Sequence, residues 1–197
     1  TRIVRGPGWP VSISMIPIRP STPPQRYRDL FDPADMPGPL FRESDIEQQK
    51  RLARVDFQSV VRSPDALDIR DPLRPERGRF ADGRVLQSAY CAMIKLIDDQ
   101  VGRILTALDV SGQRENTVVI FTSDHGEMLG DHGLIQKGCR FYEGLVRVPL
   151  IFSWPGHFAE GECSDALVEL LDKTPTIMEL AGLEPPQRMQ GRTLLPM

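Results

Sequence analysis

The stretch Asn116–Gly156, NTVVIFTSDHGEMLGDHGLIQKGCRFYEGLVRVPLIFSWPG, decides the fold. Two unbroken apolar runs, Thr117–Thr122 and Val148–Phe152, enclose a polar segment. Continuous runs of β-branched and aromatic residues are typical of strands that a sheet buries on both faces. The stretch therefore predicts two neighbouring buried strands, with the polar segment at the edge of their sheet.

Helices are expected on both sides of this stretch along the chain. Apolar residues recur at three- and four-residue steps over Leu86–Leu108, which predicts a long amphipathic helix that Ser111-Gly112 ends. Leu167–Leu171 is a candidate third strand, and Asp172 is a candidate cap for a last helix that Gly182 follows. Helices alternating with apolar strands predict an α/β fold with a mostly parallel sheet and helices on both faces.

The N-terminal part of the chain has weaker signals. Val11–Ile16 predicts a short strand, and the many prolines of Pro17–Leu40 predict an irregular segment. Ser44-Asp45-Ile46-Glu47 has the pattern of a capping box, which predicts a helix that continues to about Phe57. Arg62–Phe80 is rich in proline, arginine and aspartate and is expected to be a loop.

Composition and charge exclude several classes of partner. The net charge of -3 in 197 residues favours neither nucleic acid nor an anionic membrane surface as a partner. No apolar run reaches the roughly 18 residues of a membrane span. The three cysteines form no C-x-x-C pair, so a disulfide framework is not expected.

Asp124 and His125 are the candidate metal ligands. They follow the Thr117–Thr122 run, and ligands of open parallel sheets bind beyond the carboxyl ends of the strands. A carboxylate oxygen and an imidazole nitrogen on one tight turn can face a single ion, and Gly126 allows the backbone to bend close by. Taken alone, the pair fits better an aspartate that caps the next turn beside a surface histidine.

Lys137 is the candidate anion-binding residue. It stands in a segment dense in ionisable residues between the two apolar runs. A salt-bridged surface loop with an exposed lysine accounts for this density without any function. A fixed cation beside a metal ion would instead bind a tetrahedral anion.

Asn116–Gly156 resembles the sulfatase family of the alkaline phosphatase superfamily, in particular its iduronate-2-sulfatase- and choline-sulfatase-like arylsulfatases. Asp172-Lys173-Thr174-Pro175-Thr176 is similar to the family's D-x-x-P-T, and Gln190–Pro196 to its Q-G-x-S-L-x-P. The resemblance is strong over 90–197 and weaker over 11–80. It implies that residues 1–197 form part of one alkaline-phosphatase-like catalytic domain, incomplete at its N-terminus.

The resemblance implies a sulfuric ester hydrolase that needs a divalent metal ion. Calcium is the first expectation, with magnesium, manganese or zinc as alternatives. Asp124 and His125 resemble the late metal ligands of the family, and Lys137 resembles its sulfate-binding lysine. His132, in a G-D-H-G stretch common in the family, is expected to line the cleft rather than to act in catalysis. The substrate would be a small-molecule or saccharide sulfate ester.

The chain also departs from the family pattern. It has no C-x-P-S-R or S-x-P-S-R motif, and neither Cys91 nor Cys139 has the sequence context of that nucleophile. Ile18 stands where the family has a histidine that protonates the leaving group, and isoleucine cannot donate a proton. The isolated 197-residue chain is therefore expected to be inactive.

Two other functions fit the same residues. A metal ion and a lysine suit any tetrahedral oxyanion, so a phosphodiester or phosphonate monoester hydrolase of the same superfamily is an alternative. A non-catalytic, truncated remnant is the other, and the missing nucleophile motif and Ile18 favour it for this chain alone.

Overall fold

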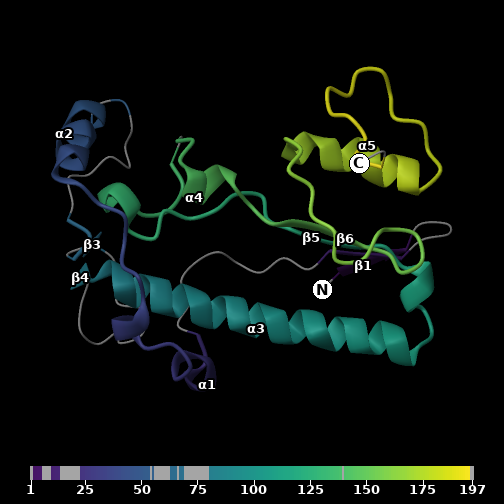
Figure 1. The fold of residues 1–197 in the computed structure, drawn as a ribbon, viewed down its shortest axis with the longest axis horizontal. Coiled ribbons are helices and arrows are strands. Elements are labelled where there is room, and N and C mark those ends of the chain that lie inside the picture. The colour runs from purple at the N-terminus through teal and green to yellow at the C-terminus, as the bar shows by residue number, and fades with distance from the viewer. Residues whose placement is uncertain are drawn as a thin grey trace. The chain divides into compact units, whose positions relative to one another are not determined.

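A computed structural model describes residues 2–5, 10–13, 23–53, 55, 63–65, 67–68, 80–138 and 140–195. They form two compact units, which are drawn in Figure 1 and are treated separately below. The first unit comprises Thr1–Ile104 and Glu127–Phe141, and the second comprises Leu105–Gly126 and Tyr142–Met197. The chain thus leaves the second unit at Gly126 and returns to it at Tyr142.

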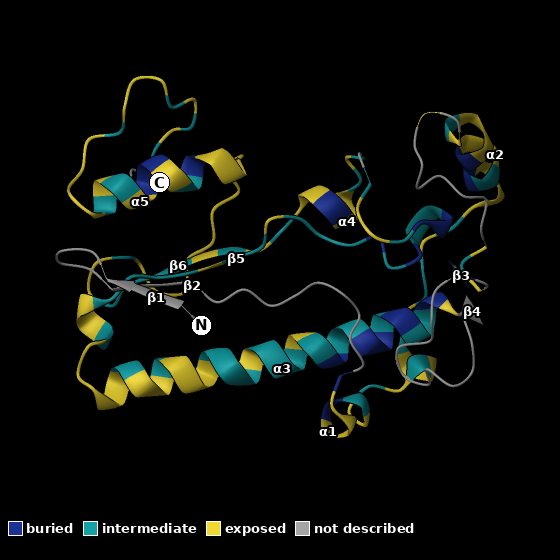
Figure 2. Cartoon of the chain, turned by 180° about the vertical axis from the view of Figure 1, so that it is seen from behind, coloured by how far each residue is buried: buried dark blue, intermediate teal, exposed yellow. Residues whose placement is uncertain are grey.

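The longest element is helix α3, Gly83–Val110, as the apolar stripe predicted. Its buried residues all lie in its N-terminal half, and its C-terminal end is mostly exposed (Figure 2). It ends in a Schellman motif, because the amide of Gln113 bonds the carbonyl of Leu108 and Gly112 adopts a φ of 66°. Neither α3 nor any other described helix combines enough length with enough apolar residues to cross a membrane.

The first unit contains most of α3 and several short elements. Its strands pair antiparallel, β1 (Arg2–Arg5) with β2 (Pro10–Ile13) and β3 (Leu67–Asp68) with β4 (Phe80–Ala81). Its short helices are α1 (Gln25–Arg28), the 3-10 helix η1 (Pro33–Asp35), α2 (Glu43–Leu52) and the 3-10 helix η4 (Asp131–Gly133). The predicted strand at Val11–Ile16 is thus confirmed as far as Ile13, and its remainder lies outside the described residues.

Two predictions for this region need correction. Helix α2 ends at Leu52 rather than near Phe57, and its N-cap is Arg42, two residues before the predicted Ser44. Arg42 has extended backbone angles and its amide donates to the Asp45 carboxylate, so Asp45 closes the first turn from the third helical position. The predicted loop Arg62–Phe80 contains β3 and the first residue of β4.

The second unit contains the two strands predicted within Asn116–Gly156, β5 (Val119–Thr122) and β6 (Leu150–Ser153). They are neighbours as predicted, but they pair antiparallel, with Phe121 opposite Ile151. All three strand pairs among the described residues are antiparallel, so the predicted mostly parallel sheet is not found there. The prediction of burial on both faces is also wrong, because Phe121 is 36% and Ile151 55% exposed.

The remaining elements of the second unit are the 3-10 helices η3 (Arg114–Asn116) and η5 (Leu170–Asp172) and the helices α4 (Glu143–Val146) and α5 (Lys173–Leu180). The candidate strand Leu167–Leu171 is wrong, because these residues are irregular as far as η5. The predicted last helix is confirmed as α5. Gly182, with a φ of 71°, follows it in a second Schellman motif.

Candidate metal and oxyanion site

Asp124 lies two residues beyond the carboxyl end of β5, as predicted. Its side chain is 71% exposed, and its Oδ1 accepts the backbone N–H of His125 at 3.0 Å. Its second oxygen, Oδ2, is 3.7 Å from His125 Nε2. The carboxylate and the imidazole therefore face each other, with Oδ2 and Nε2 as the two nearest donor atoms.

The ring of His125 is oriented by its own turn. Its Nδ1 lies 2.7 Å from the carbonyl oxygen of Gly126, a group that can only accept a hydrogen bond. In the neutral imidazole this contact places the proton on Nδ1 and the lone pair on Nε2. Ser123 Oγ donates to the His125 carbonyl at 2.7 Å and holds the backbone of the same turn. A metal-binding histidine typically makes a hydrogen bond through the ring nitrogen that does not bind the metal, as His125 Nδ1 does here with the Gly126 carbonyl.

Gly126 is required by a close backbone approach. A Cβ at this position would lie 1.9 Å from the carbonyl oxygen of Gly144. The Gly126 amide donates to the carbonyl of Leu145 at 2.9 Å, and Leu145 is buried. The turn that carries Asp124 and His125 is therefore fastened to α4.

The pair fits a metal ion in distance and donor type. Two donors each about 2.0–2.4 Å from one ion can lie 3.7 Å apart, which is the separation of Asp124 Oδ2 and His125 Nε2. An oxygen and a nitrogen donor suit manganese or zinc as well as calcium. The described residues contain no cluster of three or more histidine, cysteine, aspartate or glutamate side chains that could complete the shell.

Lys137 follows a closed loop of the first unit. The amide of Met128 bonds the carbonyl of Gln136 at 3.1 Å, and that of Gly130 bonds the carbonyl of Leu134 at 2.8 Å. Lys137 comes directly after this closure and is exposed. Because Lys137 belongs to the first unit and Asp124 and His125 to the second, their expected proximity stays a prediction.

His132 lies at the tip of that loop in an unusual backbone conformation. Its φ of 56° and ψ of 22° are left-handed, which is rare for a residue other than glycine. Its Nδ1 is 3.1 Å from Oδ1 of Asp45 in α2, and its carbonyl accepts the Gln49 side-chain amide. Sequence reasoning missed the role of Asp45 and Gln49, because a spacing of four residues places them on one face of a helix but does not indicate their distant partner.

Burial changes the acidity of two groups on α3. It raises the pKa of Tyr90, with the negative charge of Glu127 as a second cause. Burial also raises the pKa of the Cys91 thiol. A raised pKa lowers the fraction of thiolate, the form in which a cysteine acts as a nucleophile.

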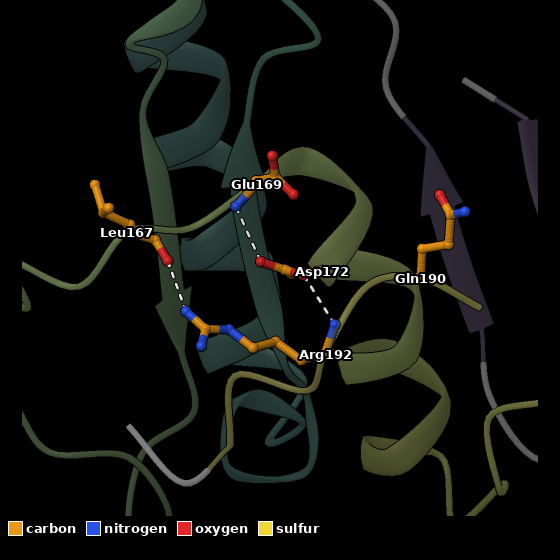
Figure 3. A pocket seen from close by; sticks show the side chains of 5 residues that line it. All are labelled: Leu167, Glu169, Asp172, Gln190 and Arg192. Atoms are coloured by element: carbon orange, nitrogen blue, oxygen red, sulfur yellow. Dashed lines mark hydrogen bonds between the residues drawn. The ribbon is translucent and has the colours of Figure 1, made fainter. Parts of the chain in front are cut away.

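A hollow of about 360 Å³ in the second unit is lined by Leu167, Glu169, Asp172, Gln190 and Arg192 (Figure 3). The Asp172 carboxylate accepts the backbone N–H groups of Glu169 and Arg192, each at 2.9 Å. The Arg192 guanidinium donates to the carbonyl of Leu167. Asp172 and Arg192 thus fasten the C-terminal segment to the start of α5, which gives this hollow a structural role.

Comparison with known proteins finds a matching family model and relatives among the sulfatases. A family model described as Sulfatase matches residues 34–183. An arylsulfatase of Clostridium perfringens is 31% identical over 96% of this chain and 38% of its own length. An N-acetylglucosamine-6-O-sulfatase of Bacteroides thetaiotaomicron is 39% identical over 54% of this chain and 19% of its own length.

Among solved structures, the phosphonate monoester hydrolase of Agrobacterium radiobacter is similar with a TM-score of 0.69 and 30% identity. The similarity covers 88% of this chain and 34% of that one. This agreement confirms an α/β fold shared over most of the chain. The chain spans less than half the length of each of these three relatives.

Proposed function

The chain belongs to the sulfatase family, and from that premise we propose that it takes part in the metal-dependent hydrolysis of a sulfate ester. Asp124 and His125 are the proposed metal ligands, and Lys137 is the proposed sulfate-binding residue. The proposal rests on the geometry of the Asp124–His125 pair. Its two donor atoms are 3.7 Å apart, and the Gly126 carbonyl lies 2.7 Å from His125 Nδ1, which favours the neutral tautomer that leaves Nε2 free to bind a metal ion.

Each of these residues has a defined task in the proposal. When bound, a divalent cation supplies positive charge that polarises the ester and stabilises an oxyanion. Asp124 contributes a negative charge that a cation needs, and His125 contributes a neutral nitrogen donor whose direction the turn sets. Lys137 binds a sulfate oxygen through its ammonium group, a compact point charge with three hydrogen-bond donors. Calcium is the proposed ion, with magnesium, manganese or zinc as alternatives.

The proposed substrate is a small-molecule or saccharide sulfate ester. The relative from Bacteroides thetaiotaomicron, whose name states an N-acetylglucosamine-6-O-sulfatase, supports the saccharide class. The segment Pro33–Leu40, which lies outside regular structure apart from η1, belongs to the proline-rich region from which selectivity is expected to come. Loops of this kind determine selectivity because they vary without disturbing the core.

A phosphonate monoester or phosphodiester hydrolase is the second candidate. The similarity to the Agrobacterium radiobacter phosphonate monoester hydrolase favours it. Charge discriminates poorly between the two, because the same cations attract a sulfate and a phosphonate oxyanion.

The test is a comparison of substrates on the full-length protein. We expect the highest kcat/KM for 4-nitrophenyl sulfate, and lower values for 4-nitrophenyl phenylphosphonate and bis(4-nitrophenyl) phosphate. Each assay is run with calcium, magnesium, manganese and zinc in turn. A higher kcat/KM for the phosphonate ester would establish the second candidate in place of the first.

A further inference from the structure

Helix α2 buries polar side chains where an amphipathic helix would bury apolar ones. Asp45 is 7% and Gln49 2% exposed, and they are the two buried residues of this ten-residue helix. They lie one turn apart on the same face. Burying a carboxylate or an amide costs free energy unless the group is hydrogen-bonded. The partners of Asp45 and Gln49 therefore indicate the role of this face of α2.

Both side chains bind the same residue. The Gln49 side-chain amide donates to the His132 carbonyl, and Asp45 Oδ1 lies 3.1 Å from His132 Nδ1. The other oxygen of Asp45 accepts the Arg42 amide at 2.7 Å, so the capping of α2 and the contact with His132 share one carboxylate. One face of α2 is thus occupied by the backbone and the ring of His132.

Leu40 holds the loop tip from another direction. Its amide donates to Asp131 Oδ1 at 2.7 Å, and its carbonyl accepts the His132 amide at 2.7 Å. A Cβ on Gly130 would lie 2.7 Å from a ring carbon of Pro39, so the two segments are in close contact. These contacts stabilise the left-handed conformation of His132, which a residue other than glycine adopts only when its surroundings determine it.

The loop whose tip is His132 ends at Gln136, the residue that precedes Lys137. Gly130 bonds Leu134 and Met128 bonds Gln136 across the loop, so the stem is closed by two backbone hydrogen bonds. Gln136, at the end of this stem, itself has a φ of 62°. The tip and the residue before Lys137 are therefore parts of one short loop that backbone hydrogen bonds close.

We propose that Asp45 and Gln49 are positioning residues, which fix through His132 the place where Lys137 meets the oxyanion. This inference rests on the proposed role of Lys137. The two side chains touch neither metal ion nor substrate in the proposal. Their effect is on binding geometry, where a displacement of about 1 Å is enough to weaken an oriented contact strongly.

The experiment compares two adjacent substitutions in the full-length protein. Gln49→Glu removes the donor to the His132 carbonyl, and Gln48→Glu makes the same chemical change on the exposed side of α2. We expect Gln49→Glu to weaken inorganic sulfate, measured as a competitive inhibitor, about tenfold or more, with metal affinity unchanged. Amide hydrogen exchange in 128–136 should accelerate in the same variant. Gln48→Glu should match the wild type in all three measurements.

A rescue distinguishes positioning from a general loss of stability. His132→Asn retains a donor for Asp45 and tolerates the left-handed backbone, whereas His132→Ala retains neither. We expect near wild-type sulfate affinity in the first and a loss like that of Gln49→Glu in the second. If Gln49→Glu does not fold, Gln49→Leu and Gln48→Leu replace the pair.

Lys137→Ala separates the two ways in which the inference can fail. Weaker sulfate binding in Lys137→Ala together with unchanged binding in Gln49→Glu would overturn the positioning role alone. Unchanged binding in Lys137→Ala would overturn the proposed role of Lys137, and the inference with it.

Discussion

Asp172 Oδ1 lies 2.9 Å from the backbone nitrogen of Arg192, twenty residues further along the chain. The other carboxylate oxygen accepts the amide of Glu169, so one buried side chain holds both the start of η5 and the C-terminal segment. The Leu194 amide donates a further hydrogen bond to the hydroxyl of Thr176 in α5. The C-terminal segment is therefore held by the Asp172 carboxylate and the Thr176 hydroxyl.

Asp172→Asn should lower the stability of the second unit. The amide side chain has one acceptor oxygen for two backbone donors, so one N–H loses its partner, at a cost of about 1–2 kcal/mol. Thermal unfolding at pH 7 measures the loss. Asp165→Asn, on an exposed aspartate, is the matched control and should melt like the wild type.

The contribution of Asp172 should depend on pH. Its backbone hydrogen bonds with Glu169 and Arg192 lower its pKa below the ordinary value of 3.8. A lowered pKa means that the stabilisation is complete well above pH 3.8 and is lost as the pH falls through the folded-state pKa. The difference in melting temperature between wild type and Asp172→Asn should therefore be constant from pH 7 to 5 and shrink below pH 3.8. A difference that stays constant down to pH 2 would contradict the assignment.

Gly126→Ala should destabilise the turn that carries Asp124 and His125. The new Cβ would collide with the Gly144 carbonyl oxygen, and separating the two backbones should cost about 1–3 kcal/mol. Gly102→Ala is the control, because a Cβ there meets nothing within 4 Å and lies within α3. That substitution should stabilise by up to about 1 kcal/mol. Chemical denaturation of both variants gives the comparison.

Asp124→Ala should abolish metal-dependent activity in the full-length protein. Removing a direct ligand should weaken metal binding by more than the roughly 10–100-fold that outer-shell partners typically cost. Isothermal titration with each of the four cations measures the affinity. Asp109→Ala, which removes another exposed carboxylate, should leave it unchanged. Equal affinity in both variants would argue against Asp124 as a ligand.

The 197-residue chain assayed by itself should not turn over 4-nitrophenyl sulfate or 4-nitrophenyl phosphate with calcium, magnesium, manganese or zinc. Its sequence contains no C-x-P-S-R or S-x-P-S-R motif, and loss of a nucleophile typically costs several orders of magnitude in rate. Metal-dependent turnover that disappears in Lys137→Ala would show that another residue of this chain is the nucleophile.

Local features of the structure could be predicted because neighbouring residues determine them. The apolar period from Leu86 to Leu108 is repeated over enough turns to specify α3, and Gly112 and Gly182 end their helices because they can adopt a positive φ. β5 and β6 follow from two uninterrupted apolar runs. The position of Asp124 just beyond β5 follows from the order of residues in one strand and one turn.

Contacts between distant segments could not be predicted in this way. The sequence contained the candidates Asp124, His125 and Lys137, but it did not indicate that Asp45 and Gln49 bind His132, because 87 and 83 residues separate the partners. The antiparallel pairing of β5 with β6 could not be predicted either, because an apolar run is compatible with a parallel or an antiparallel neighbour. The direction depends on the path that the chain takes between the two strands. Periodicity, caps and turns act within a few residues and are decided by the sequence itself, whereas register, burial and the partners of a buried polar group depend on which segments the tertiary structure brings together.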